Sequence, residues 1–216
     1  MPGDFTRERE EMIERQIIAR GVRNAGVIDA MRRVPRHLFV PEEIRHHAYE
    51  DSALAISHGQ TISQPYIVAY MTELIKPGKD LRLLEKIGTG TGYQSAVAAE
   101  VFGEVYTVEI IGEFSEAAGD LLNSLGYKNI KLKTGDGFFG WDEFAPFDRI
   151  IITAAPPEVP ENLLRQLRPA GILASPVGAE SQHILKITKG SNGKSTYERM
   201  IDVRFVRMTG EIEKNP

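Results

Sequence analysis

Glycines at alternate positions are the most informative residues of the chain. Gly88, Gly90 and Gly92 follow an apolar stretch at 81–87 and precede a segment with a helical pattern. Glycine permits a tight turn and lets a ligand lie against bare backbone, and ligands of open α/β sheets bind at the carboxyl ends of the strands. The G-x-G-x-G spacing differs from the dinucleotide fingerprint and from the phosphate loop. It fits S-adenosylmethionine instead, with these three glycines and Thr89 as cofactor-binding residues.

Acidic residues follow the next two predicted strands. Glu109 ends the strand expected at 105–109, within the alternating segment 104–110, where its carboxylate is placed to accept from both ribose hydroxyls. The alternative is a solvated carboxylate at a strand end. Asp136, with Gly137 beside it, follows the predicted strand at 129–133 and is expected to accept from the adenine amino group. The alternative there is an ordinary turn aspartate.

Composition excludes several kinds of site. The 216 residues are 42% hydrophobic and 26% charged, close to the globular average. No cysteine is present, which excludes disulfides, thiolate zinc sites, iron–sulfur clusters and cysteine nucleophiles. The spacing of His37, His46, His47 and His58 matches no zinc pattern, so no metal is expected.

Charge and hydropathy limit the partners and the location. The formal net charge is -4, so the chain lacks the positive field that draws phosphate backbones, and nucleic acid is not an expected partner. No apolar run reaches the roughly 20 residues that a membrane-spanning helix needs, and the charged start lacks the apolar core of a signal peptide. We expect a cytoplasmic protein without membrane contact, and a monomer.

Apolar periodicity predicts an α/β chain. Strands and helices alternate from 81 to 177, which implies βαβ units and a doubly wound, mostly parallel sheet with helices on both faces. Asn192-Gly193 between the last two predicted strands implies an antiparallel hairpin at the C-terminal edge, whereas 36–62 has no clear period. The predicted helices cover 7–20, 25–33, 63–75, 93–102, 113–125 and 158–167, and the predicted strands cover 81–87, 104–110, 129–133, 149–155, 172–177, 182–188 and 197–208.

Ordered motifs along residues 9–209 resemble the protein-L-isoaspartate (D-aspartate) O-methyltransferase family. The segment HGQTISQPYIVA at 58–69 is the most specific of them, because methyltransferases in general do not share it. The resemblance implies a class I S-adenosylmethionine-dependent methyltransferase fold with an N-terminal helical extension. We expect one domain, in which 1–62 is a helical, substrate-side segment and 63–216 is the cofactor-binding core. The other motifs lie at 34–41, 87–94, 106–109, 135–137, 146–155, 167–171 and 176–178.

The resemblance also implies a reaction. A methyl group would pass from S-adenosylmethionine to the free carboxylate of L-isoaspartyl, and by the family's name D-aspartyl, residues in damaged proteins and peptides. The methyl ester then closes to a succinimide, which reopens partly to normal aspartate. Because a carboxylate with a pKa near ~4 is already ionised at neutral pH, the enzyme has mainly to align the reacting atoms and exclude water.

The resemblance assigns residues to the substrate side of the site. Ser63 is the expected catalytic residue, because the matching serine in the family lies beside the reacting carboxylate. Its alternative role is that of a helix N-cap. Thr61 and Gln64 are weaker candidates. Substrate-binding roles are expected for His58, Thr61, Ile62, Val206 and Arg207.

Two positions depart from the family's pattern. The family has an acid two residues before its first glycine, where this chain has Lys86, and Glu85 lies one residue earlier. Either a β-bulge brings Glu85 to the site, or Lys86 points at it and opposes the cofactor's sulfonium. Where the family commonly has Pro-Leu, this chain has Arg207-Met208. Arg207 therefore adds a carboxylate contact or alters substrate preference.

Other functions stay open from the sequence. One is a methyltransferase for another peptide carboxylate. Another is a protein that binds S-adenosylmethionine or isoaspartyl peptide without turnover, which Lys86 keeps open. A nicotinamide enzyme comes third, because the glycine spacing disfavours it.

Overall fold

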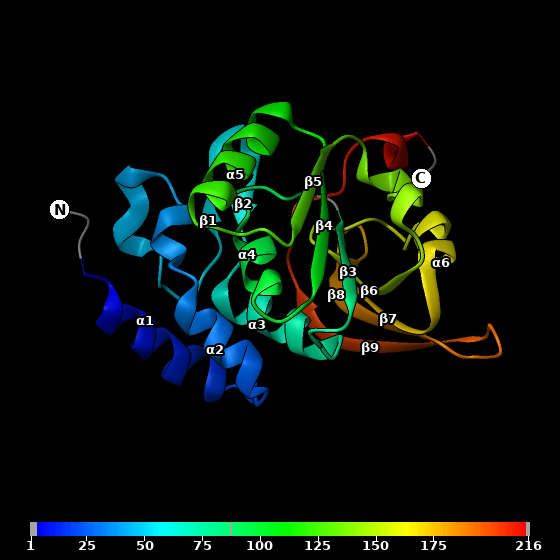
Figure 1. Ribbon diagram of the computed structural model, residues 1–216, viewed down its shortest axis with the longest axis horizontal. Coiled ribbons are helices and arrows are strands. Elements are labelled where there is room, and N and C mark those ends of the chain that lie inside the picture. The colour runs from blue at the N-terminus through cyan, green and yellow to red at the C-terminus, as the bar shows by residue number, and fades with distance from the viewer. Residues whose placement is uncertain (1–3, 87, 215–216) are drawn as a thin grey trace.

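A seven-stranded sheet forms the centre of the computed structural model, which describes residues 4–86 and 88–214, with only the backbone of Glu85 and Lys86 (Figure 1). The strand order is β5-β4-β3-β6-β7-β8-β9. Strands β3 to β7 pair in parallel, whereas β8 and β9 pair antiparallel. The chain builds β3, β4 and β5 in one direction and then crosses to β6 on the other side of β3, so the sheet's switch point lies between β3 and β6. The strands are β3 Arg82–Lys86, β4 Glu104–Glu109, β5 Ile130–Thr134, β6 Phe147–Ile152, β7 Leu167–Val177, β8 Gln182–Lys189 and β9 Ser195–Val203.

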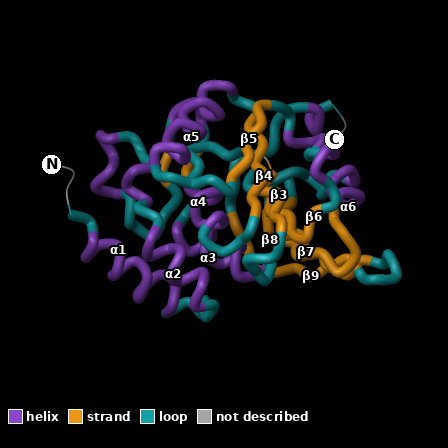
Figure 2. Tube along the Cα trace, viewed as in Figure 1, coloured by secondary structure: helices purple, strands orange, loops and turns teal. Residues whose placement is uncertain are grey.

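Helices cover both faces of this sheet. The N-terminal helices and α3, α4 and α5 lie on one side of it, and α6 lies on the other (Figures 1 and 2). Within the described residues, no helix has the length and apolar character needed to cross a lipid bilayer. The helices are α1 Thr6–Met12, α2 Ala25–Arg33, α3 Pro65–Leu74, α4 Tyr93–Ala99, α5 Gly112–Ser124 and α6 Glu161–Gln166, and a wider π-helical turn, Ile13–Ile18, continues α1.

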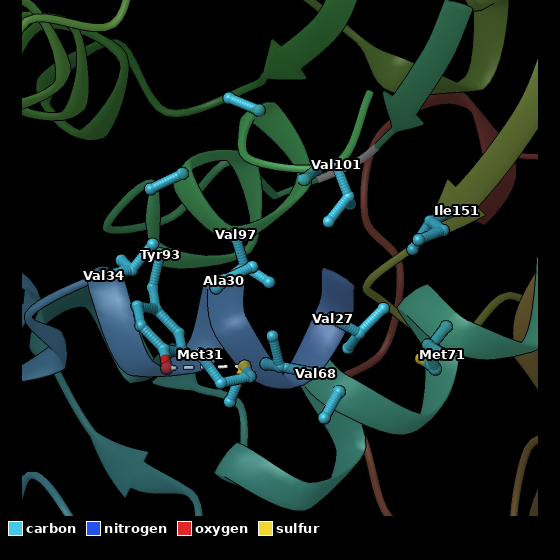
Figure 3. Close-up of a cluster of buried hydrophobic side chains, with 14 of the residues drawn as sticks. Val27, Ala30, Met31, Val34, Val68, Met71, Tyr93, Val97, Val101 and Ile151 are labelled. Atoms are coloured by element: carbon cyan, nitrogen blue, oxygen red, sulfur yellow. Dashed lines mark hydrogen bonds between the residues drawn. The ribbon is translucent and has the colours of Figure 1, made fainter. Parts of the chain in front are cut away.

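Neighbouring residues of each strand enter two separate cores, because strand side chains alternate between the faces of a sheet. Leu83 packs in the cluster under the N-terminal helices, and Leu84 packs in the cluster under α6. In the first cluster, Met31 of α2, Val68 of α3 and Val97 of α4 converge (Figure 3). The N-terminal helices therefore share a core with the helices that cover the sheet.

The segment between α2 and α3 is made of short turns. It contains the 3-10 turns Arg36–Phe39, Glu42–His47 and Ser57–Gly59, and a two-stranded hairpin of β1 Leu54–Ala55 and β2 Thr61–Ile62. The third 3-10 turn joins the two strands of that hairpin. Such turns have no apolar period, which explains why the sequence predicted no element at 36–62.

A buried arginine joins this segment to α4. Arg36 is 0% exposed, its Nε donates to the Ala48 carbonyl at 2.7 Å, and its guanidinium lies 4.8 Å from the centre of the Tyr93 ring. Burial lowers the pKa of Arg36 to about 10. Within the described residues no carboxylate pairs with it. Its charge is therefore balanced by the aromatic ring and the carbonyl dipole.

The parallel sheet, the helices on both faces and the antiparallel C-terminal hairpin are confirmed. The last predicted strand, 197–208, is too long, because the chain leaves β8 after Val203. There the Phe205 N–H donates to the Gln182 side-chain carbonyl at 2.6 Å, and the Met208 N–H donates to the Ala155 carbonyl at 2.9 Å. The predicted helix 158–167 is also too long. It begins after Pro160, which cannot donate within a helix.

Candidate functional site

The glycine turn after β3 has a backbone that other residues adopt with strain. Gly88, Gly90 and Gly92 have φ angles of 85°, 52° and 86°, in the region that favours glycine. A Cβ at Gly88 or Gly90 would meet no atom closer than 3.7 Å. Conformation, not crowding, therefore requires glycine at those two positions, and the turn presents bare backbone at the switch point of the sheet.

Glu109 lies at the carboxyl end of β4, directly beside that turn. It is 2% exposed, and its two carboxylate oxygens accept from Gly90 N at 2.8 Å and from Ile111 N at 2.9 Å. No cation of the described residues pairs with it. Each carboxylate oxygen has a further lone pair. A buried, unpaired anion with free acceptor capacity is suited to a ligand that carries hydroxyl donors and a positive charge.

A cavity lies between the glycine turn and the β1–β2 hairpin. Its volume is about 70 Å³, and it adjoins a groove of about 630 Å³ with which it shares Thr61, Ser63 and Val206. The cavity is lined by Gln60, Thr61, Ile62, Ser63, Val68, Gly88, Thr89, Gly90, Thr91, Tyr93, Gln94, Glu109, Ile110, Ile111, Phe114, Thr153, Ala154, Val206, Arg207 and Thr209.

Ser63 faces both the cavity and the groove. Helix α3 begins at Pro65 with Gln64 as its N-cap residue, so the Ser63 hydroxyl does not cap the helix. Among the described residues the hydroxyl has no hydrogen-bond partner. Gln64 is held outside the cavity, since its Nε2 donates to the Asp51 carbonyl at 3.0 Å and to Asp51 Oδ1 at 2.7 Å. Ser63 thus has a free polar group where the two spaces meet.

The remaining predicted substrate residues differ in position. Thr61, Ile62 and Val206 line the cavity, and so does Arg207, whose guanidinium is exposed. His58 does not line it. Its Nε2 lies 3.3 Å from a carboxylate oxygen of Glu113, and its ring lies edge-on to Phe114, which does line the cavity. His58 therefore holds the hairpin turn against α5.

Three predicted cofactor residues, Gly92, Asp136 and Gly137, lie outside the cavity lining. Gly137 is buried in a 3-10 turn, and Asp136 accepts from Phe138 N and Glu211 N, each at 2.7 Å. The contact with adenine stays a prediction. The question of Glu85 or Lys86 concerns side chains outside the described residues, although the backbone pairing of β3 with β4 continues without a register shift through Lys86.

Sequence reasoning missed part of the lining. Phe114 belongs to no motif, whereas Thr153 lies in the motif at 146–155 but was not expected in the site. Ile110 could have been found from the sequence, because it directly follows the strand-end acid Glu109. Its side chain is 39% exposed and lines the cavity. In the ranges 4–86 and 88–214, no group of three or more His, Asp or Glu is arranged to hold a metal ion.

The fold and the site define a class of protein. A glycine turn at the switch point of a mostly parallel sheet, followed by a buried carboxylate at the end of the next strand, is the arrangement of the class I methyltransferases. A family model described as protein-L-isoaspartate(D-aspartate) O-methyltransferase matches residues 7–213. The chain belongs to this family.

Individual relatives agree with that assignment. A protein-L-isoaspartate O-methyltransferase of Opitutus terrae is 49% identical over 207 residues, covering 95% of this chain and 88% of that protein. One from a Picosynechococcus species is 50% identical over 202 residues, covering 94% and 90%. Each alignment therefore covers nearly the whole of this chain.

Solved structures share the fold. A protein-L-isoaspartate O-methyltransferase superposes with a TM-score of 0.86 at 28% identity, covering 96% of this chain and 69% of that one. A Plasmodium falciparum structure described as a protein-L-isoaspartate O-methyltransferase, in complex with S-adenosyl-L-homocysteine, gives 0.78 at 24% identity, covering 96% and 99%. The second likeness concerns the fold alone.

Proposed function

We propose that this protein methylates the free carboxylate of L-isoaspartyl residues, and of D-aspartyl residues, in damaged proteins and peptides, with S-adenosylmethionine as the methyl donor. The observation that carries the proposal is the pairing of two groups across one cavity. A buried carboxylate, Glu109, lies on the side of the glycine turn, and an unbonded hydroxyl, Ser63, lies on the side of the groove. The first suits a cationic nucleoside donor and the second suits an anionic acceptor.

The residues present fit S-adenosylmethionine. Glu109 has one lone pair left on each oxygen for ribose hydroxyls, and Gly88 to Gly92 supply bare backbone beside it. When bound, S-adenosylmethionine supplies a methyl group on a sulfonium, which the acceptor oxygen takes as the carbon–sulfur bond breaks and its electron pair returns to sulfur. We assign Asp136 and Gly137 to the adenine end, where Asp136 keeps free acceptor capacity.

The acceptor side needs positioning rather than proton transfer. A carboxylate is already ionised at neutral pH, and the described lining contains neither His nor Lys. Ser63 donates a hydrogen bond to the acceptor carboxylate, and Arg207 adds a positive charge at the same end of the cavity. Ile62 and Val206 exclude water from the reacting atoms. Thr61 contributes a hydroxyl where cavity and groove meet.

Labelled methyl transfer to a synthetic isoaspartyl peptide tests the proposal, with the aspartyl peptide of the same sequence as control. Transfer to the isoaspartyl peptide alone is the expected result. Transfer to the aspartyl peptide would indicate a different carboxylate specificity. Calorimetric binding of S-adenosylmethionine without any transfer would indicate a binding protein.

Domain organisation and assembly are part of the proposal. We infer one domain, in which 1–62 serves the substrate side and 63–216 binds the cofactor, supported by the core that α2 shares with α3 and α4. We further propose a cytoplasmic monomer that does not bind nucleic acid, in keeping with the net charge of -4. Light scattering after size exclusion would test the monomer.

A further inference from the structure

Two arginines with free side chains lie beside the acceptor end of the site. Arg204 lines the groove and Arg207 lines the cavity. Both are exposed, and neither guanidinium makes an ion pair or hydrogen bond with any residue in 4–86 or 88–214. Their positive charges are therefore available to whatever occupies these two spaces.

The acidic side chains around the groove are already paired. Asp202, which lines the groove, accepts from Arg199 at 2.8 Å, and Asp51 pairs with Arg20 at the edge near Gln64. These pairs offset the carboxylates of the groove and leave Arg204 and Arg207 without a paired carboxylate, although the carboxylate of Glu109 also lines the cavity, on the side of the glycine turn. On a chain with a net charge of -4, this gives the groove a local positive potential.

The backbone fixes where the two charges lie. Phe205 is held at both its N–H and its carbonyl by the Gln182 side chain, and Ala155 bonds to the Val206 carbonyl and the Met208 N–H. Arg204 and Arg207 therefore stand three residues apart on a fixed segment, about 10 Å if it is extended. A peptide that places its acceptor at Ser63 and extends into the groove passes this segment, because Ser63 and Val206 line both spaces.

We propose that Arg204 and Arg207 make the enzyme prefer isoaspartyl residues whose neighbours along the peptide are Asp or Glu. The inference rests on the proposed function, which supplies the peptide. It adds a specificity that arises from two unpaired cations at fixed positions in a groove whose own acids are paired. Lysine-flanked isoaspartyl residues are poor substrates for the same reason.

Three isoaspartyl peptides that differ only in their flanking residues test this preference. Two Glu, two Gln or two Lys are placed on each side of the isoaspartate. The order of kcat/KM is Glu above Gln above Lys, by about two- to fivefold for each arginine engaged, as for exposed charge pairs. The difference lies in KM and shrinks at about 1 M salt, where the screening length is ~3 Å.

Variants locate the effect. Arg204→Gln and Arg207→Gln each lower the Glu-to-Lys ratio, and the double variant brings it close to one. Asp202→Asn raises the ratio, because it leaves the positive charge of Arg199 without its carboxylate partner at the edge of the groove. Arg165→Gln is the matched control, since Arg165 is an exposed arginine of α6 that lines neither the cavity nor the groove. Ratios taken within one variant cancel any loss of folding or cofactor affinity.

The outcomes distinguish a failure of this inference from a failure of the proposed function on which it rests. Equal kcat/KM for the three peptides, or an unchanged ratio in the double variant, overturns the role of the arginines while leaving isoaspartyl methylation intact. Failure of the wild-type protein to methylate any isoaspartyl peptide overturns the proposed function instead.

Discussion

Replacing Glu109 by Gln alters the charge of the cavity while keeping the size of the side chain. The carboxylate now accepts from two backbone N–H groups and is 2% exposed. An amide has only one accepting oxygen. At the position that the amide nitrogen takes, a backbone N–H or a ribose hydroxyl therefore loses a charge-assisted hydrogen bond of about 1.5–3 kcal/mol. At 1.4 kcal/mol per factor of ten, the dissociation constant for S-adenosylmethionine is expected to rise about ten- to a hundredfold.

Calorimetry with matched ligands distinguishes a ribose contact from a purely structural role. The wild-type protein is expected to bind the 2′-deoxy analogue of S-adenosylhomocysteine more weakly than S-adenosylhomocysteine, and Glu109→Gln is expected to reduce that difference. Glu116→Gln is the control, because Glu116 is an exposed carboxylate of α5. If Glu109→Gln loses the same factor for both ligands, the carboxylate serves only to hold the glycine turn and the ribose assignment is wrong.

Three further predictions address other residues. Ser63→Ala is expected to lower kcat with little change in cofactor affinity or melting temperature, since Ser63 does not cap α3; a lower melting temperature with unchanged kcat would make its role structural. Burial, then Arg9 and Arg45, hold the pKa of His37 below its usual value, so the unfolded state takes up a proton near pH ~6.5 and stability falls below that pH. The urea midpoint of His37→Gln should fall less between pH 8 and pH 5, and an equal fall in both proteins would contradict this. From the sequence, Lys86→Glu should tighten S-adenosylmethionine more than S-adenosylhomocysteine, which lacks the sulfonium charge; equal changes would count against it.

The sheet was predictable because its strands carry strong local patterns. The Ile run in β6 and the alternation in β4 are typical of strands that are buried on one or both faces. The same alternation gave a wrong strand end near the end of the chain, because 204–208 continues the pattern of β9 although β9 ends at Val203. There the competing bonds come from Gln182 and Ala155, which are distant in sequence. Periodicity cannot report such partners.

The site shows the same division between local and distant information. Glu109 could be placed beside the glycine turn because both follow neighbouring parallel strands. The contact of Asp136 with Glu211 N spans 75 residues of sequence and could not be foreseen. The burial of Arg36 was equally hidden, because arginine is rarely inside a protein.

The stacking of Arg36 on Tyr93 links two regions that contribute differently to the site. Tyr93 begins α4, directly after Gly92, and lines the cavity, whereas Arg36 belongs to the segment of short turns before α3. A ligand that orders the glycine turn must therefore also oppose local opening of that segment, and by thermodynamic reciprocity an opened segment weakens the ligand. Amide hydrogens of 36–49 should then exchange more slowly when cofactor is bound, so that residues 36–49 report occupancy of a cavity to which they contribute no lining residue.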